Sequence, residues 1–200
     1  MKSSLIIMCF FLMGLLLAYG HILLGTVTRY DFSMYVLYVL MFLVGMSIGN
    51  DFKVLQALKE QNWRIFFVPL ATILGTLAGS ALVSVVLSGR SLTDCLAVGA
   101  GFGYYSLASV FITEYKGAEL GTVALAANII REMITLLGAP LLVCWFGKLA
   151  PISAGGATTM DTTLPVITRY AGKEFVIVSV FHGFVVDFSV PFLVTFFCKI

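Results

Sequence analysis

The chain has 200 residues, of which 60% are hydrophobic and 11% are charged, with a formal net charge of +2. Soluble globular domains carry about 25% charged residues, so this chain has too few charges to cover a surface that faces water. The composition excludes cytosolic enzymes, nucleic-acid-binding proteins and disordered modules. Long apolar runs predict instead an all-α polytopic membrane protein, with residues 1–200 forming a single integral membrane domain.

Charge-free stretches locate the membrane segments, because a bilayer core needs about 20 helical residues. Five full transmembrane helices are predicted: 5–26, 32–49 and 65–88 carry no formal charge, whereas the apolar stretch 119–146 is interrupted at Arg131 and Glu132 and the stretch 175–198 contains His182 and Asp187. The first follows Met1-Lys2 and has the position of a signal peptide. Its apolar region is longer than the roughly 7–15 residues of such a peptide, which favours a retained helix.

Two further apolar segments, 95–113 and 150–170, are poor continuous helices. The first contains Gly99, Gly101 and Gly103, and the second contains Gly155-Gly156 and Pro165. Glycine loosens a helix and proline breaks it, and a broken backbone at membrane depth persists only inside protein or beside a watery cavity. Paired interrupted segments are a pointer to a transporter binding site.

The two broken segments also resemble each other in sequence. Residues 101–119 and 156–174 agree at six of nineteen positions at an offset of 55, five of them in the last eight positions. We interpret this as an internal repeat rather than as shared composition. If both segments span the membrane, the repeat is parallel; if both are re-entrant, it is inverted. Inverted repeats are frequent in secondary transporters, which favours re-entrant hairpins.

Basic residues set the expected orientation. Lys53, Lys59 and Arg64 lie in the longest polar loop, which the positive-inside rule assigns to the cytoplasm. The N-terminus is then inside and the C-terminus outside. The balance of basic residues is the same whether the broken segments span or are re-entrant, so charge does not decide between these alternatives.

Ionisable residues at membrane depth cost about 2.5–3.5 kcal/mol each and are functional candidates by default. Glu132 lies near the middle of 119–146 and Asp161 near the middle of 150–170. Asn128 shares a helix face with Glu132, so a ligand could meet both. Arg131 is about 100° around the helix from Glu132, and we expect it to pair with Asp161 or Asp187 instead. Acidic residues outnumber basic residues at membrane depth, so a site there suits a cation, a proton or both.

Other polar residues near the breaks complete the candidate substrate-binding or proton-coupling set. His182 could shuttle protons or could be a hydrogen-bonded packing residue, and Asp187 could belong to the site or to the structure. Tyrosines could stack on a cation or lie at the membrane interface. These further candidates are Tyr104, Tyr105, Ser106, Thr158, Thr159, Thr162, His182 and Asp187.

Motifs for metal, redox, nucleotide or catalytic chemistry are absent from the sequence. The cysteines, Cys9, Cys95, Cys144 and Cys198, have no CxxC spacing. The glycine run at 99–103 has neither GxGxxG spacing nor a βαβ context, and no HExxH, GxSxG or intramembrane aspartyl constellation is present. No cofactor, no metal and no enzymatic activity are therefore expected.

Five runs resemble the bacterial L-lysine exporter family of the LysO type, and the resemblance covers about residue 37 to the C-terminus. They are FLVGMSIGND (42–51), GFGYYSLASVFITE (101–114), NIIREM (128–133), GATTMDTTLP (156–165) and HGFVVDFSVP (182–191). The resemblance implies an inner-membrane exporter of L-lysine and related basic amino acids, driven by proton exchange. It also implies a functional intramembrane acidic pair, which falls by motif on Glu132 and Asp161.

The sequence departs from the family pattern in two places. Many members carry further N-terminal helices before the matched region, so this chain resembles the larger piece of a split version. We therefore expect a small membrane subunit or a homodimer. Position 128 is Asn where other members carry Asp, which affects the expected proton site. The alternative functions are a cation channel or a transporter for another cationic solute.

Overall fold

The computed structural model describes Met13, Val39, Phe42, Met46, residues 63–87 and residues 89–200. The chain divides into two compact units, Met1–Asn50 and Asp51–Ile200, and the description below concerns the second unit. The predicted spans 5–26 and 32–49 lie outside the described residues apart from single positions. The prediction of one domain over 1–200 stays a prediction.

The described residues are helical and contain no strand. Three helices are long and apolar enough to cross a membrane: α5 (Phe67–Val86), α8 (Ala118–Phe146) and α11 (Val176–Lys199). They confirm the helices predicted at 65–88, 119–146 and 175–198. A short 3-10 turn, η1 (Trp63–Phe66), precedes α5.

Both segments that were predicted to be broken are broken. The first consists of α6 (Leu92–Gly99), a turn at 100–104 and α7 (Tyr105–Lys116), and we call it hairpin one. The second consists of α9 (Ala150–Gly155), the 3-10 helix η2 (Gly156–Met160) and α10 (Leu164–Tyr170), and we call it hairpin two. A further 3-10 turn, η3 (Lys173–Phe175), leads into α11.

Each broken segment turns back on itself, as the ion pairs between its two ends show. At the base of hairpin one, Lys116 Nζ lies 3.4 Å from Asp94 Oδ1, and Arg90 pairs with Glu119 just beyond. At the base of hairpin two, Lys148 Nζ lies 3.1 Å from Glu174 Oε1. The long helix α8 runs from the first base to the second, so the hairpins point toward each other from opposite ends.

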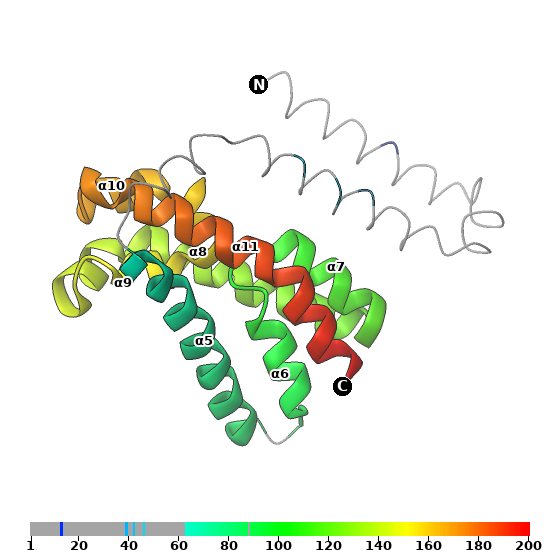
Figure 1. Ribbon diagram of the computed structural model, residues 1–200. Coiled ribbons are helices and arrows are strands. Elements are labelled where there is room, and N and C mark those ends of the chain that lie inside the picture. Colours follow the sequence, from blue (N-terminus) through cyan, green and yellow to red (C-terminus); the bar gives the residue numbers. More distant parts are fainter. Residues whose placement is uncertain (1–12, 14–38, 40–41, 43–45, 47–62, 88) are drawn as a thin grey trace. The chain divides into compact units, whose positions relative to one another are not determined.

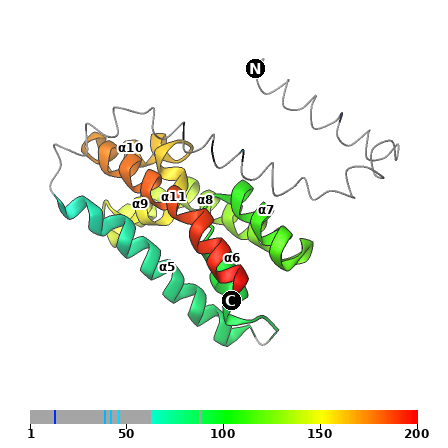
Figure 2. The same ribbon diagram turned by 45° about the vertical axis from the view of Figure 1, so that its right-hand side comes forward.

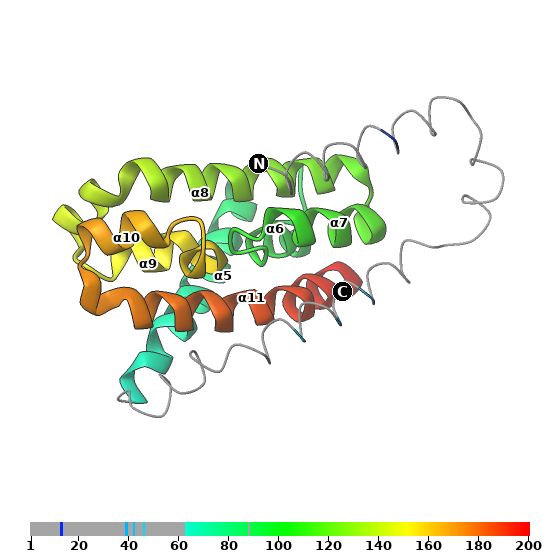
Figure 3. The same cartoon turned by 90° about the horizontal axis from the view of Figure 1, so that it is seen from above.

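The hairpins lie between α8 and α11, as the view from above shows (Figure 3). Helix α11 packs on η2, α6 and α7, whereas α8 packs on α7 and α9. Helix α5 runs along the outside of this layer with α6 beside it (Figures 1 and 2). Buried side chains are concentrated on α11, whereas α5 and α8 leave most of their apolar side chains exposed.

Local sequence explains where the helices break. Ser91 caps α6 by accepting a hydrogen bond from the Asp94 N–H at 3.1 Å. The turn after α6 contains Phe102 at φ 45° and Gly103 at φ 94°, and the break in hairpin two contains Gly156 at φ 64°. These left-handed conformations are incompatible with a continuing α-helix. Pro165 stands in the first turn of α10, where its missing N–H costs nothing.

The close approach of the two tips requires glycine at position 156. A Cβ atom built there clashes with the Phe102 carbonyl oxygen, and the positive φ adds backbone strain of about 1–3 kcal/mol.

Gly156→Ala is therefore expected to lower the thermal unfolding temperature of the purified protein. In the α5 interior, a Cβ at Gly75 meets nothing within 4 Å, so Gly75→Ala is expected to stabilise by roughly 0.5–1 kcal/mol. An equal change in unfolding temperature in the two variants would contradict the close contact between the two hairpin tips.

Candidate functional site

The tips of the two hairpins meet through their backbones. The Ala157 N–H donates to the Phe102 carbonyl at 2.9 Å. Asn128, buried on α8, holds the first tip, because its Oδ1 accepts from the Gly103 N–H at 2.7 Å. Its Nδ2 donates to the Ala124 carbonyl at 2.8 Å, which fixes the amide orientation. Asn128 therefore anchors the hairpin, a role that its helical spacing from Glu132 did not predict.

Arg131 holds the tip of hairpin two. Its Nε donates to the Ala154 carbonyl at 2.8 Å, and its Nη2 donates to the Ser153 carbonyl at 3.0 Å and to Thr76 Oγ1 at 3.3 Å. A cation beside the C-terminal carbonyls of a helix is electrostatically favourable. The expected pairing of Arg131 with Asp161 or Asp187 was wrong: the described residues show no ion pair to Arg131, and helix carbonyls take that place.

The guanidinium of Arg131 also lies against hairpin one. Its Cζ is 5.9 Å from the centroid of the Phe102 ring, within the range of a cation–π interaction. Arg131 therefore contacts both tips and, through Thr76, helix α5. Its Nη1 donates no hydrogen bond to any residue that the structure describes.

The acidic candidates differ in their surroundings. Asp161 is exposed at the tip of hairpin two, where its Oδ1 accepts from the Thr162 N–H at 2.5 Å and from the Thr162 hydroxyl at 3.4 Å. Asp187 is only 5% exposed on α11. Both carboxyl groups lie close enough to interact electrostatically with the half-buried Tyr104 hydroxyl and with each other. Tyr104, Asp161 and Asp187 therefore form one acidic cluster.

Glu132 is half-buried on α8 and has no hydrogen bond or ion pair with the described residues. Tyr105 and Ser106 begin α7 and are exposed, with Tyr105 37% exposed. Their side chains make no hydrogen bond within the described part of the chain; the Ser106 carbonyl accepts from the Ser109 hydroxyl at 3.2 Å. The structure therefore does not join these three residues to the acidic cluster.

The threonines at the second tip satisfy its broken backbone. Thr158 Oγ1 donates to the Gly155 carbonyl at 3.0 Å and lies 3.2 Å from Thr163 Oγ1. Thr159 Oγ1 lies 2.8 Å from the Gly156 carbonyl oxygen and 2.9 Å from the Ser179 carbonyl oxygen. The hydroxyls thus replace helical hydrogen bonds that the break removes.

His182 is fully buried and links three elements. Its Nδ1 lies 3.2 Å from Thr159 Oγ1 on η2, and its Nε2 lies 2.9 Å from Thr72 Oγ1 on α5. This is the arrangement of a packing histidine with both ring nitrogens satisfied. Sequence reasoning missed Thr72 and Thr76, although hydroxyls four residues apart on an apolar helix mark one polar stripe that could have identified them.

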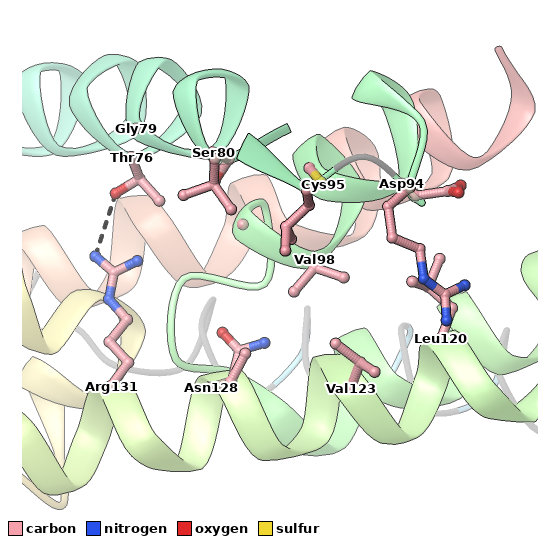
Figure 4. A pocket seen from close by; sticks show the side chains of 15 residues that line it. Thr76, Gly79, Ser80, Asp94, Cys95, Val98, Leu120, Val123, Asn128 and Arg131 are labelled. Carbon is pink, nitrogen blue, oxygen red and sulfur yellow. Dashed lines mark hydrogen bonds between the residues drawn. The ribbon is translucent and has the colours of Figure 1, made fainter. Parts of the chain in front are cut away.

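A cavity of about 520 Å³ opens between α5, α6 and α8. Thr76, Asn128 and Arg131 line one end, and Arg90 and Asp94 line the other. Figure 4 shows Val98 and Val123 between these ends, with Arg131 reaching across to Thr76. Small-molecule sites have volumes of about 300–1,000 Å³ and combine apolar walls with a few polar groups, and this cavity has both properties.

The histidine bridge makes a testable distinction. His182→Ala removes two buried hydrogen bonds and side-chain packing, and is expected to destabilise the protein by about 2–4 kcal/mol. His182→Gln keeps a donor and an acceptor, so it should unfold at a temperature between those of the unmodified protein and His182→Ala. Unfolding of His182→Ala at the temperature of the unmodified protein would contradict the bridging role of the imidazole.

Comparison with known proteins identifies relatives over most of the chain. The lysine exporter LysO of Escherichia coli is 33% identical over 165 residues, which are 82% of this chain and 54% of that protein. A candidate lysine exporter of Haemophilus influenzae is 30% identical over 165 residues, which are 82% of this chain and 83% of that protein. The chain thus spans about half the length of the E. coli relative. No solved structure was found to match.

The sequence profile of the family described as "Lysine exporter LysO" matches residues 8–198, and this match includes both hairpins and all three long helices. The chain therefore belongs to the lysine exporter LysO family.

Proposed function

We propose that this chain forms the core of a secondary transporter that exports L-lysine and related basic amino acids from a bacterial cell. Membership of the lysine exporter family supports the substrate class. The observation that carries the transport mechanism is the meeting of two opposed hairpin tips through the Ala157–Phe102 hydrogen bond. Broken helices that meet within a bundle present backbone dipoles and polar side chains to a solute.

The proposed arrangement in the inner membrane follows from the helix directions. Helices α5, α8 and α11 cross the bilayer, and the two hairpins enter it from opposite faces without crossing. Two helix–hairpin units, related by an inverted repeat, then place the tips near mid-depth. Matching conformations of Gly117 (φ 96°, ψ 163°) and Gly172 (φ 117°, ψ 158°), which each follow a hairpin, support this repeat.

The orientation that we propose has the N-terminus in the cytoplasm and the C-terminus outside. The C-terminal end of α11 lies beside hairpin one, because Lys199 Nζ is 5.5 Å from the Tyr115 ring. The base of hairpin one then faces outward and the base of hairpin two faces inward. Lys148, Arg169 and Lys173 at the second base would be cytoplasmic, as the positive-inside rule favours.

Glu132 and Asp161 are proposed as the acidic pair that binds the substrate's ammonium groups or carries the exchanged protons. Neither carboxylate is paired with a cation among the described residues, so each remains available to a ligand. A carboxylate that alternately binds a proton and a cationic solute would couple lysine export to proton entry. The buried Asp187, beside Asp161, is proposed to assist by holding a proton within the same cluster.

Neutralising either acid tests this assignment. A charge-assisted hydrogen bond contributes about 1.5–3 kcal/mol, and each 1.4 kcal/mol corresponds to about tenfold in binding. Glu132→Gln and Asp161→Asn should therefore insert normally but lower lysine efflux by about tenfold or more. The measurement is efflux from cells loaded with a lysine dipeptide, at equal membrane abundance.

Glu114→Gln is the matched control, because Glu114 is exposed on α7 near the base of hairpin one. Its efflux should equal that of the unmodified protein. Normal efflux by the Glu132 or Asp161 variant would remove that residue from the proposed pair. Lysine efflux from loaded vesicles that is independent of a pH gradient would favour the alternative, a cation channel or passive pore.

Assembly is a further part of the proposal: a small membrane subunit or a second copy of the chain completes the wall around the hairpins. Helix α8 leaves Leu137, Trp145 and Phe146 between 71% and 76% exposed, and α5 leaves Leu82, Val85 and Val86 between 70% and 82% exposed. Such faces meet lipid or partner helices in a membrane protein.

Purification in mild detergent followed by mass measurement is expected to give a complex heavier than one chain. We expect the complex either to contain two copies or to retain a small membrane protein. A monodisperse single chain that still binds lysine would contradict obligate assembly.

A further inference from the structure

We propose that the cavity between α5, α6 and α8 binds the α-carboxylate of the exported amino acid, with Arg131 as the group that recognises it. This inference rests on the proposed export of basic amino acids and specifies which part of the substrate lies in the cavity. The exporter is then selective for amino acids with a free carboxylate, and discriminates against diamines of the same length.

The first reason is the state of the guanidinium. Arg131 has five N–H donors, of which three are used by the carbonyls of Ser153 and Ala154 and by Thr76 Oγ1. Both donors of Nη1 have no protein acceptor in the described part of the chain. No carboxylate there neutralises the guanidinium, and a cation at membrane depth requires a partner.

The second reason is that Arg131 is rigidly positioned at one end of the cavity. Two helix carbonyls, the Thr76 hydroxyl and the Phe102 ring hold its head group at the point where both hairpin tips meet. Nη1, the nitrogen whose donors remain, can donate to a carboxylate oxygen, and the charge of the guanidinium strengthens this hydrogen bond. A carboxylate bound to Arg131 would therefore contact a side chain that touches both hairpins.

The third reason is the lining beyond Arg131. Val98 and Val123 give the cavity apolar walls in its middle, and its volume of about 520 Å³ accommodates an amino acid with water. An aliphatic stem such as the four methylenes of lysine suits these walls. Asp94 is the acidic residue that lines the cavity, at the end away from Arg131, whereas Glu132 and Asp161 lie outside the lining and keep their proposed role in proton exchange.

Comparison of two ligands across two proteins tests the inference. L-Lysine and 1,5-diaminopentane share the methylene chain and terminal amine, but only lysine has a carboxylate. The full chain, in its native assembly in mild detergent, should bind lysine about tenfold or more tightly than the diamine. Arg131→Gln should lower lysine affinity to that of the diamine and leave diamine affinity unchanged.

Contrary outcomes separate the inference from the function on which it rests. Equal affinity of the unmodified protein for both ligands, or an equal loss of both in Arg131→Gln, would overturn the carboxylate site while lysine export stands. No change for either ligand in Arg131→Gln would overturn it as well. Failure of the unmodified protein to bind lysine at all would overturn the proposed function itself.

Arg131 also caps α9, so replacing it can prevent folding. A second pair of variants therefore tests the inference without changing Arg131. Ala127 and Ala126 are both exposed on α8, but only Ala127 lines the cavity. Ala127→Phe fills the cavity and should abolish the preference for lysine over the diamine, whereas Ala126→Phe should retain it. Retained preference in Ala127→Phe, at unchanged thermal stability, would place the carboxylate elsewhere.

Discussion

The structure depends on satisfying the backbone groups that two broken helices leave open. Hydrocarbon offers no hydrogen-bond partners, so each open group needs a partner within the protein or in trapped water. The Ala157 N–H uses the Phe102 carbonyl, the Gly103 N–H uses Asn128, and the last carbonyls of α9 use Arg131. The polar side chains Asn128 and Arg131 on α8 thus hydrogen-bond to the hairpins.

This requirement changes the interpretation of the polar residues in the spans. Asn128 and His182 resemble ligand-binding residues in the sequence, yet each is buried with its polar atoms committed to other elements. Arg131 is committed only in part. Asp161 stands at the exposed tip, and Glu132 has no protein partner among the described residues. The groups that remain open to a solute are therefore fewer than the polar groups in the sequence.

The sequence predicted the long helices and the two breaks because both depend on local properties. Long apolar stretches identify α5, α8 and α11, although α8 contains Arg131 and Glu132 and α11 contains Asp187. The glycines of the two broken segments, together with Pro165, mark the breaks, whereas the single prolines Pro140 and Pro191 lie inside α8 and α11. That each broken segment turns back was predicted only by analogy with other secondary transporters. The split of basic residues between the two sides of the membrane is the same whether the segments span or are re-entrant, so charge did not decide between these topologies. Ion pairs such as Asp94–Lys116 reveal the return, and they join residues far apart in the chain. The role of Arg131 was not predictable, because its partners are backbone carbonyls, which every residue possesses.

The central claim is that the hairpin tips line the path of the exported amino acid. Thr162, exposed beside Asp161, tests it most directly when replaced by cysteine in a protein whose four native cysteines are changed to serine. A small cationic methanethiosulfonate should modify Thr162→Cys, and L-lysine should slow this reaction. The same reagent should leave cysteine unmodified at Val110, an exposed apolar position on α7. An unreactive Thr162→Cys, or a reaction rate that lysine does not change, would contradict the claim.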